Sequence, residues 1–221
     1  MDTETLFTEQ KWNILKLLTK DKFSPLQLAQ KSNTTIANIS QQLRLLEMGN
    51  LVQKEKIPNR EKGKPRALFS LTGDYAYLIL VMKGFGQKRL LKLGDHHKLM
   101  IKIWFLDDSS IHYYLEKFYW KIEEYIGQIT AIVVNPVGQD IEVIIVSEKP
   151  RDIERKIGAT TIKKPNDKTR SIIVKAFNLD EFKKLVKQGK EPFSSLSINQ
   201  VIYDPEGIIS DITNKGGGNK E

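Results

Sequence analysis

Apolar residues recur at helical spacing in three segments near the N-terminus. The first runs from Glu9 to Thr19, and Ser24 is a suitable N-cap for a second helix that begins at Pro25. A third helix follows Thr34, after a short polar connection at 31–34. On a helical wheel the apolar side chains of this third helix gather on one side: Ile36, Ile39, Leu43 and Leu46.

The opposite side of the third helix is polar. Thr34, Asn38 and Gln41 lie there, with Gln42 and Arg44 at the flanks. Asn and Gln can pair with adenine, Arg with guanine, and a Thr methyl with thymine in the major groove. This face therefore suits DNA, and the alternative is an ordinary solvated helix surface.

A hairpin is predicted directly after the third helix. Gly49 or Asn50 can adopt the left-handed conformation that ends a helix, and Leu51 then returns to the core. Residues 51–57 and 66–71 both favour strands, and the sequence PNREKGKP between them favours a turn.

The sequences SQQLRLLEMGNLV and GKPRALFSLT resemble winged helix-turn-helix transcriptional regulators of the ArsR and MarR type, over residues of about 8–72. In that family the hairpin is the wing. The resemblance implies that Thr35, Asn38, Gln41 and Gln42 face bases, while Ser40, Arg44 and the wing approach phosphates. Ser40 has an alternative interpretation, because it lies near the packed side, where a small residue lets helices approach. The predicted DNA-binding residues are Thr34, Thr35, Asn38, Ser40, Gln41, Gln42, Arg44, Arg60, Lys62, Lys64 and Arg66.

Charge is concentrated in the same half of the chain. Residues 1–100 contain 17 Lys and Arg against 9 Asp and Glu, whereas residues 101–221 contain 18 of each. The net charge of +8 therefore lies with the predicted DNA-binding segment. Six basic residues and two acidic ones occur between Lys54 and Arg66 alone. Phosphate contacts by such residues release counterions, so we expect binding to weaken with salt.

Composition narrows the class of protein. The chain has 221 residues, of which 40% are hydrophobic, enough for two small domains. No apolar run approaches a membrane span, and the acidic, polar start does not resemble a signal peptide, so we expect a cytoplasmic protein without membrane contact. The absence of cysteine excludes disulfides and thiolate metal sites. Richness in Lys, Glu and Ile is typical of a thermophilic, archaeal source.

The fold class predicted is α+β, with domains at 1–85 and 107–214, a connecting segment at 86–106 and a flexible tail at 215–221. A helix at 75–82 is expected to follow the wing, and in winged-helix regulators a helix there often supports a homodimer, which would imply a palindromic site. His96, His97 and His112 lack a carboxylate at ligand spacing, so no metal site is expected.

The second domain shows regular alternation of elements. Asp108 to Ser110 can cap a long helix that reaches about Ile126, and the strands ITAIVVN and DIEVIIVS follow, joined by a tight turn. A charged helix near 151–156, a second hairpin at 160–177 with Asn166 and Asp167 in its turn, and a helix at 179–187 capped by Asn178 complete the pattern.

This order resembles a minimal nucleotidyltransferase domain. Asp140 and Glu142 would stand at the paired-acid positions, on one face of a strand. However, Asn135 and Pro136 replace the Gly-Ser of that family, and the strand at 171–175 offers no third acid. The resemblance therefore implies a catalytically inactive domain, and the alternative for both acids is a solvated strand edge.

Two functions remain open, and a third, a winged helix that contacts protein or RNA, is disfavoured by the basic wing. The first is a sequence-specific transcriptional regulator that binds double-stranded DNA as a homodimer, with no catalytic residues, metal or cofactor. Its second domain would serve oligomerisation or bind an effector, either a small molecule or a protein. The second is a nucleotidyltransferase that uses the winged helix for docking.

Overall fold

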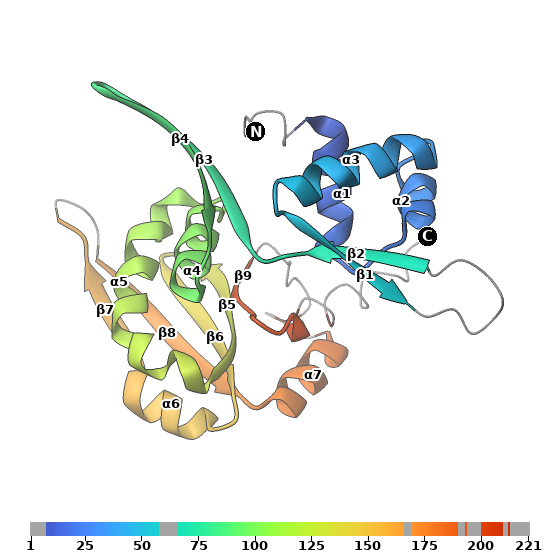
Figure 1. The fold of residues 1–221 in the computed structure, drawn as a ribbon. Helices are drawn as coiled ribbons and strands as arrows, with labels where there is room; N and C mark the ends of the chain where they lie inside the picture. Colours follow the sequence, from blue (N-terminus) through green and yellow to red (C-terminus); the bar gives the residue numbers. More distant parts are fainter. Residues whose placement is uncertain are drawn as a thin grey trace. The chain divides into compact units, whose positions relative to one another are not determined.

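The chain divides into two units, Met1–Gly94 and Asp95–Glu221, and its fold class is the expected mixed α+β. We analysed a computed structural model that describes residues 8–57, 66–165, 169–189, 193, 200–209 and 212 (Figure 1).

Three helices open the first unit, as predicted: α1 (Glu9–Leu18), α2 (Pro25–Lys31) and α3 (Ile36–Met48). Ser24 begins α2 with a capping box, in which the Gln27 backbone N–H donates to the Ser24 hydroxyl and the Ser24 N–H donates to the Gln27 side chain. The core of these helices is aliphatic and closely packed: Ile14, Leu15, Leu18, Leu28, Ile39, Leu43 and Leu46 are all at least 92% buried.

Two apolar side chains of these helices differ from the sequence interpretation. Ile36 was assigned to the packed stripe of α3 but is 48% exposed, because it is the first residue of the helix, at the margin of that stripe. Trp12 was counted among the apolar positions of α1 but is 52% exposed, since it lies off the side that Ile14, Leu15 and Leu18 share.

The hairpin after α3 consists of β1 (Val52–Ile57) and β2 (Arg66–Leu71), antiparallel and in register from Val52 opposite Leu71 to Ile57 opposite Arg66. Asn50, with φ of 56°, provides the left-handed step that ends α3, and Leu51 is buried as expected. Phe23 forms a β-bridge with Phe69, which ties the segment before α2 to the hairpin. The turn at 58–65 lies outside the described residues.

The predicted helix at 75–82 is wrong. Residues Tyr75–Met82 form strand β3, which pairs antiparallel with β4 (Phe85–Lys92) through a turn at Lys83 and Gly84. Eight consecutive apolar or aromatic residues have no helical periodicity, and Gly84, with φ of 80°, favours a tight turn. The expected connecting segment at 86–106 is also structured, because it contains β4 and helix α4 (Asp95–Trp104).

The second unit is built on a five-stranded mixed sheet of order β7-β8-β6-β5-β9. Its strands are β5 (Ile129–Val137), β6 (Asp140–Ser147), β7 (Thr160–Lys163), β8 (Thr169–Phe177) and β9 (Val201–Tyr203). The two predicted hairpins are present as β5–β6 and β7–β8, while β6 and β8 run parallel. Strand β6 is therefore central, with neighbours on both sides.

Helices cover both faces of this sheet (Figure 1). On one face, Ile141, Val143 and Ile145 of β6 share a core with α4, α5 (His112–Ile122) and α6 (Pro150–Ile157). On the other, Ile144 and Val146 pack with α7 (Leu179–Gln188). Asp108 caps the short 3-10 helix Ser109–Ile111 before α5, and Asn178 caps α7, both as expected. The predicted helix to Ile126 ends its α-helical part at Ile122 and continues as a 3-10 helix, Glu123–Gln128.

Candidate nucleic-acid interface

Helix α3 presents a continuous solvent-exposed face. Thr35 is its N-cap, and the Asn38 backbone N–H donates to the Thr35 hydroxyl at 3.2 Å. On one side Ile39, Leu43 and Leu46 anchor the helix in the core. The exposed arc on the other side consists of Ala37, Ser40, Gln41, Arg44, Glu47 and Met48. A helix held in this way offers its outer side chains to a partner without unfolding.

The DNA-contacting residues predicted between Thr34 and Arg44 fall into two groups. Ser40, Gln41 and Arg44 are exposed on adjacent turns. The exposure of Ser40 removes the alternative in which it serves helix packing. The outer face of α3 therefore has a hydroxyl, an amide and a guanidinium group within one patch, where they can reach a ligand together.

The other group is half-buried and joined by hydrogen bonds. The Asn38 amide nitrogen donates to the Thr34 hydroxyl at 3.0 Å, and the Gln42 amide nitrogen donates to the Asn38 side-chain oxygen at 3.3 Å. Both ends of the Asn38 amide are thus engaged by neighbouring residues of α3 and the segment before it. These hydrogen bonds fix the orientation of the Asn38 and Gln42 amides. Thr34, Asn38 and Gln42 border the exposed arc and are therefore less available to a ligand than Gln41 and Arg44.

Ala37 was not selected from the sequence, yet it lies in the centre of the exposed arc. It sits one turn before Gln41 and three residues before Ser40, so the same wheel that selected those residues also places it between them. Because it carries no polar group, a search for base-pairing side chains does not find it. A methyl group at that point can contact a thymine methyl and lets the helix backbone approach closely.

Strand β1 adds exposed positive charge. Lys54 and Lys56 share a face with Val52, the face on which Phe69 of β2 joins the helical core. Glu55 points to the opposite face, where Lys22 donates to it at 2.8 Å. This hydrogen bond and the carboxylate charge raise the pKa of Lys22. The one acidic residue of β1 is therefore paired away from the two lysines.

The remaining predicted basic contacts are not placed. Arg60, Lys62 and Lys64 lie outside the described residues, and Arg66 opens β2 but its side chain is also outside them. Among the basic residues that the structure does describe, Arg44 lies on α3 and Lys54 and Lys56 lie on β1, which follows it.

The paired acids of the second unit lie in different environments. Asp140 and Glu142 share a face of β6 by alternation, but Asp140 is exposed at the strand end and Glu142 is only 7% exposed. Glu142 forms an ion pair with Lys175 and accepts a hydrogen bond at 3.1 Å from the Asn135 amide, which lies opposite it in β5. Its carboxylate is thus engaged within the sheet.

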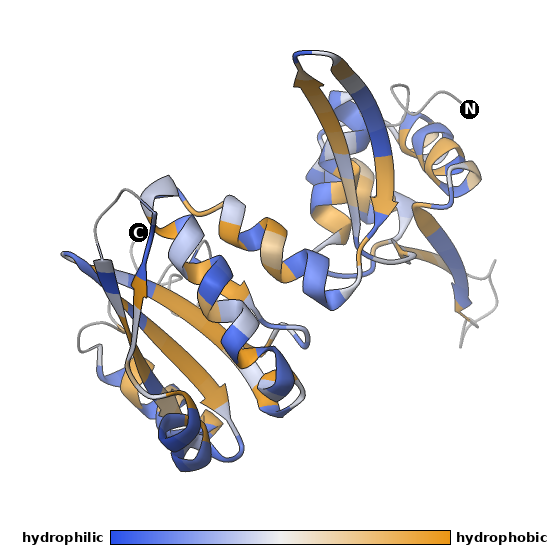
Figure 2. Cartoon of the chain, turned by 90° about the vertical axis from the view of Figure 1, so that its left-hand side faces the viewer, coloured by the Kyte–Doolittle hydropathy of each residue, from blue (hydrophilic) through white to orange (hydrophobic). Residues whose placement is uncertain are grey.

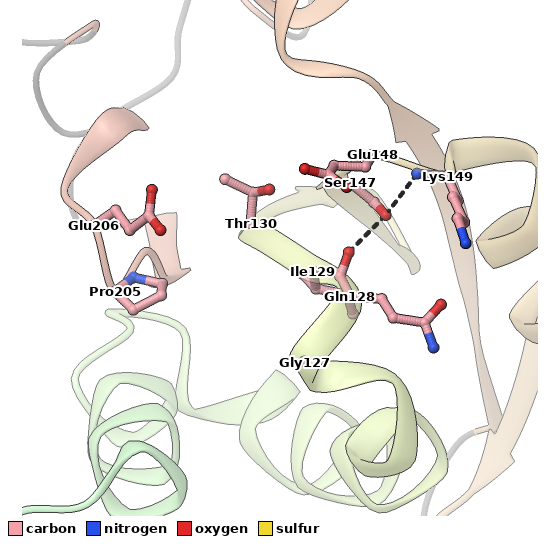
Figure 3. Close-up of a pocket in the computed structure, with 9 residues that line it drawn as sticks. All are labelled: Gly127, Gln128, Ile129, Thr130, Ser147, Glu148, Lys149, Pro205 and Glu206. Atoms are coloured by element: carbon pink, nitrogen blue, oxygen red, sulfur yellow. Dashed lines mark hydrogen bonds between the residues drawn. The ribbon is translucent and has the colours of Figure 1, made fainter.

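A cavity of about 330 Å³ lies at the end of the sheet where β5 begins and β6 ends (Figure 3). Its lining is mixed, with Gln128, Thr130, Glu148, Lys149 and Glu206 beside Pro205. Ser147 shapes its wall, since its hydroxyl donates to the Gln128 carbonyl at 2.7 Å and accepts from the Lys149 N–H at 3.1 Å (Figure 3). Such a cavity has the size and polarity for a small polar molecule.

Two of the three histidines make polar contacts within the second unit. His96 and His97 lie in α4, where His96 Nδ1 is 3.0 Å from the Tyr119 hydroxyl, and His112 Nε2 is 2.9 Å from the Leu106 carbonyl. Burial and the neighbouring Glu123 raise the pKa of Tyr119. In the described part of the chain, no three His, Asp or Glu side chains gather as metal ligands.

No model of a protein family matches the chain, and no curated protein matches its sequence. Among the described helices, none has both the length and the apolar character needed to cross a membrane.

Proposed function

We propose that the chain is a sequence-specific DNA-binding transcriptional regulator that acts as a homodimer. In this proposal the first unit is a winged helix-turn-helix, α3 enters the major groove, and the β1–β2 hairpin is the wing on the phosphate backbone. The observation that carries it is the exposed arc of α3, with Ala37, Ser40, Gln41 and Arg44 on one surface and no buried side chain among them.

The chemistry of this arc fits the edges of base pairs. The Gln41 amide can donate to and accept from adenine, and the Arg44 guanidinium can bind guanine bidentately or a phosphate. Ala37 offers a methyl group to thymine. The Ser40 hydroxyl can donate to a phosphate oxygen or a base. Because α3 itself carries both Arg44 and Glu47, its contribution is recognition more than net charge.

The wing supplies the charge. Lys54 and Lys56 lie on the face of β1 that continues from the helical core, so they reach the same side as the helices. Each phosphate contact by a lysine contributes about 0.9 to the slope of log affinity against log salt concentration. This division assigns specificity to α3 and salt-dependent affinity to the wing.

The test is a selection of bound sequences from random duplex DNA, followed by titration of the recovered site. Gln41→Ala and Arg44→Ala should each weaken binding to that site by about 1–3 kcal/mol, which is roughly 5- to 150-fold. Gln188→Ala and Arg151→Ala are matched controls, because both residues are exposed in the second unit and should leave affinity unchanged. Equal binding by all four variants would reject α3 as the reading helix.

A salt titration separates the roles of helix and wing. The double variant Lys54→Gln, Lys56→Gln should lower the salt slope by about 1.8 without changing which sequence is preferred. Arg44→Ala should instead change the preference at one base pair, or lower the slope by about 0.9 if it contacts a phosphate. An unaltered slope in the double variant would remove the wing from the interface.

The second unit is proposed as the site of an effector, with the cavity between Gln128, Ser147 and Glu206 as the place for a small molecule. The alternative of nucleotidyl transfer has no supporting observation in the described residues, since Glu142 is engaged by Lys175 and Asn135. Magnesium-dependent nucleotide transfer that is lost in Asp140→Ala would establish that alternative.

A further inference from the structure

The β3–β4 hairpin is an arm whose outer half is uncovered. Figure 1 shows the two strands running out from the end of β2 as a two-stranded ribbon. The side chains near its turn are exposed: Ile79 is 65% exposed, Leu80 43%, Val81 85%, Met82 58% and Phe85 42%. Soluble monomers rarely expose a contiguous apolar group of this kind, which usually marks an interaction surface.

Strand β3 is apolar on both of its faces. Tyr77, Ile79 and Val81 project to one face, and Leu78, Leu80 and Met82 to the other, because side chains alternate along a strand. A strand of this composition normally lies inside a sheet with neighbours and cover on both sides. Among the described residues its sheet has two strands, and an isolated two-stranded hairpin is marginally stable in water.

Charge distinguishes the two edges of the arm. Strand β3 carries no ionisable side chain other than its tyrosines, whereas β4 carries Lys88, Arg89 and Lys92 and no acid. Figure 2 shows this difference, with the outer part of β3 hydrophobic and the middle of β4 hydrophilic. Two copies that met through β4 would bring like charges together, whereas copies that meet through β3 keep the two basic strands apart at the outer edges.

We propose that the arm is a dimerisation device, in which β3 pairs antiparallel with β3 of a second copy of this chain. The product is a four-stranded sheet of order β4-β3-β3-β4 across a two-fold axis at Leu80. With this centre Leu80 faces its own counterpart, Ile79 faces Val81, and Leu78 faces Met82. Every pair in this stretch is apolar, and both copies use the same surface, as two-fold symmetry requires.

A lipid surface suits the arm less well than a second copy. Lys83 is exposed in the turn at the tip, so insertion of the tip into a bilayer would bury its charge. An acidic protein partner would bind along β4 and leave the apolar β3 edge uncovered. The β3 pairing accounts for both the apolar strand and the placement of the basic one.

This proposal rests on the homodimer of the proposed function and identifies β3 as the surface through which the two copies meet. Its test contains no DNA, so its failure leaves DNA reading by α3 untouched. The full chain should sediment as a dimer by analytical ultracentrifugation. Leu80→Lys should raise the dimer dissociation constant about 30-fold or more, as for a central interface residue. Gln87→Lys is the matched control, since Gln87 lies opposite Leu80 on the same face but on the outer strand, and it should leave the constant unchanged.

Cross-linking tests the centre of the pairing. The chain has no cysteine, so a single introduced cysteine reports on one position only. Leu80→Cys should form an intermolecular disulfide under mild oxidation, because residues directly opposite each other in antiparallel strands have Cα atoms about 4.5–5.5 Å apart, within disulfide range. Gln87→Cys on β4 should cross-link far less.

Four outcomes would overturn the proposal. They are a monomer for the unmodified chain at all concentrations, a dimer that Leu80→Lys leaves intact, cross-linking at Gln87→Cys equal to that at Leu80→Cys, and a monomer that instead co-sediments with anionic lipid vesicles. The last result would assign the arm to a membrane surface. Circular dichroism of Leu80→Lys, unchanged from the unmodified chain, checks that loss of the dimer is not loss of the fold.

Discussion

Two strands of eight residues, β3 and β6, have similar apolar sequences but opposite surroundings. In β6, DIEVIIVS, the residues from Ile141 to Ser147 are all buried, between β5 and β8 and beneath helices on both faces. In β3, YAYLILVM, the last four residues are exposed, and β4 is its sole strand neighbour among the described residues. An apolar run thus specifies that a strand should be covered, but it does not specify that the same chain supplies the cover.

The comparison assigns the two units different tasks. The second unit covers its central strand β6 with its own strands and helices. It has no net charge, as expected for a self-contained scaffold around a cavity. The first unit carries the net charge of +8 together with its uncovered arm. Under our proposals, it therefore depends on partners in two ways, through DNA at α3 and through a second copy at β3.

The largest expected effect on stability comes from shortening one apolar side chain in each of the two strands and measuring unfolding at different protein concentrations. Ile144→Ala removes a fully buried side chain and should lower the free energy of unfolding by about 2–5 kcal/mol, with the same value at every concentration. Leu80→Ala should cost less, and its cost should shrink on dilution, because it acts through the dimer. Urea unfolding at two protein concentrations measures both. A concentration-independent loss for Leu80→Ala would mean that β3 is covered within its own chain.

Most helices and strands could be predicted from the sequence, but β3 could not. Helices α1 to α3 were predicted because their apolar spacing has a helical period and because caps such as Ser24 mark their ends. Both hairpins of the second unit were predicted because turn residues join two strand-like segments in each. Strand β3 was predicted as a helix because a continuous apolar run has no period to distinguish the two. The turn at Lys83 and Gly84 was the available signal for a hairpin.

The helical wheel of α3 also predicts the candidate interface, and the residues that it misplaces lie at the border of the exposed arc. Gln41 and Arg44 are exposed as predicted, whereas Asn38 and Gln42 are half-buried and engaged with each other. A wheel gives the angle of a side chain but not the hydrogen bonds between adjacent turns. Nor can it locate the partner of Glu142, because Lys175 reaches that residue from a neighbouring strand 33 positions along the chain.

A second prediction concerns the one carboxylate that β6 buries. Lys175→Met leaves the Glu142 charge with the Asn135 amide alone and should lower the free energy of unfolding by about 1–2 kcal/mol, less than for a fully buried pair because the Lys175 side chain is 49% exposed. Lys163→Met, an exposed lysine on β7, is the control. Adding Glu142→Gln to Lys175→Met should recover most of the loss, and equal losses in both single lysine variants would show that the ion pair contributes nothing.

The smallest expected effect concerns the residues that follow α3 and α7, because both helices end with the same backbone conformation. Asn50 after α3 and Gly189 after α7 both adopt the left-handed conformation, with φ of 56° and 59°. Asn50→Ala and Gly189→Ala should each cost about 1 kcal/mol, because a Cβ disfavours this conformation, and Asn50→Gly should stay within about 0.5 kcal/mol of the unmodified chain.

Thermal unfolding measures these losses, and Gly86→Ala, at a strand glycine with ordinary φ and open space around a new Cβ, is the control. The Asn50 carbonyl accepts hydrogen bonds from the Thr72 and Tyr75 hydroxyls, at 2.6 and 3.2 Å. These bonds use the backbone of residue 50, so they persist in Asn50→Ala, and α3 keeps its place relative to β1. DNA affinity should therefore be unchanged even though stability falls. A loss of affinity larger than the loss of stability explains would show instead that the Asn50 side chain itself contributes to DNA binding.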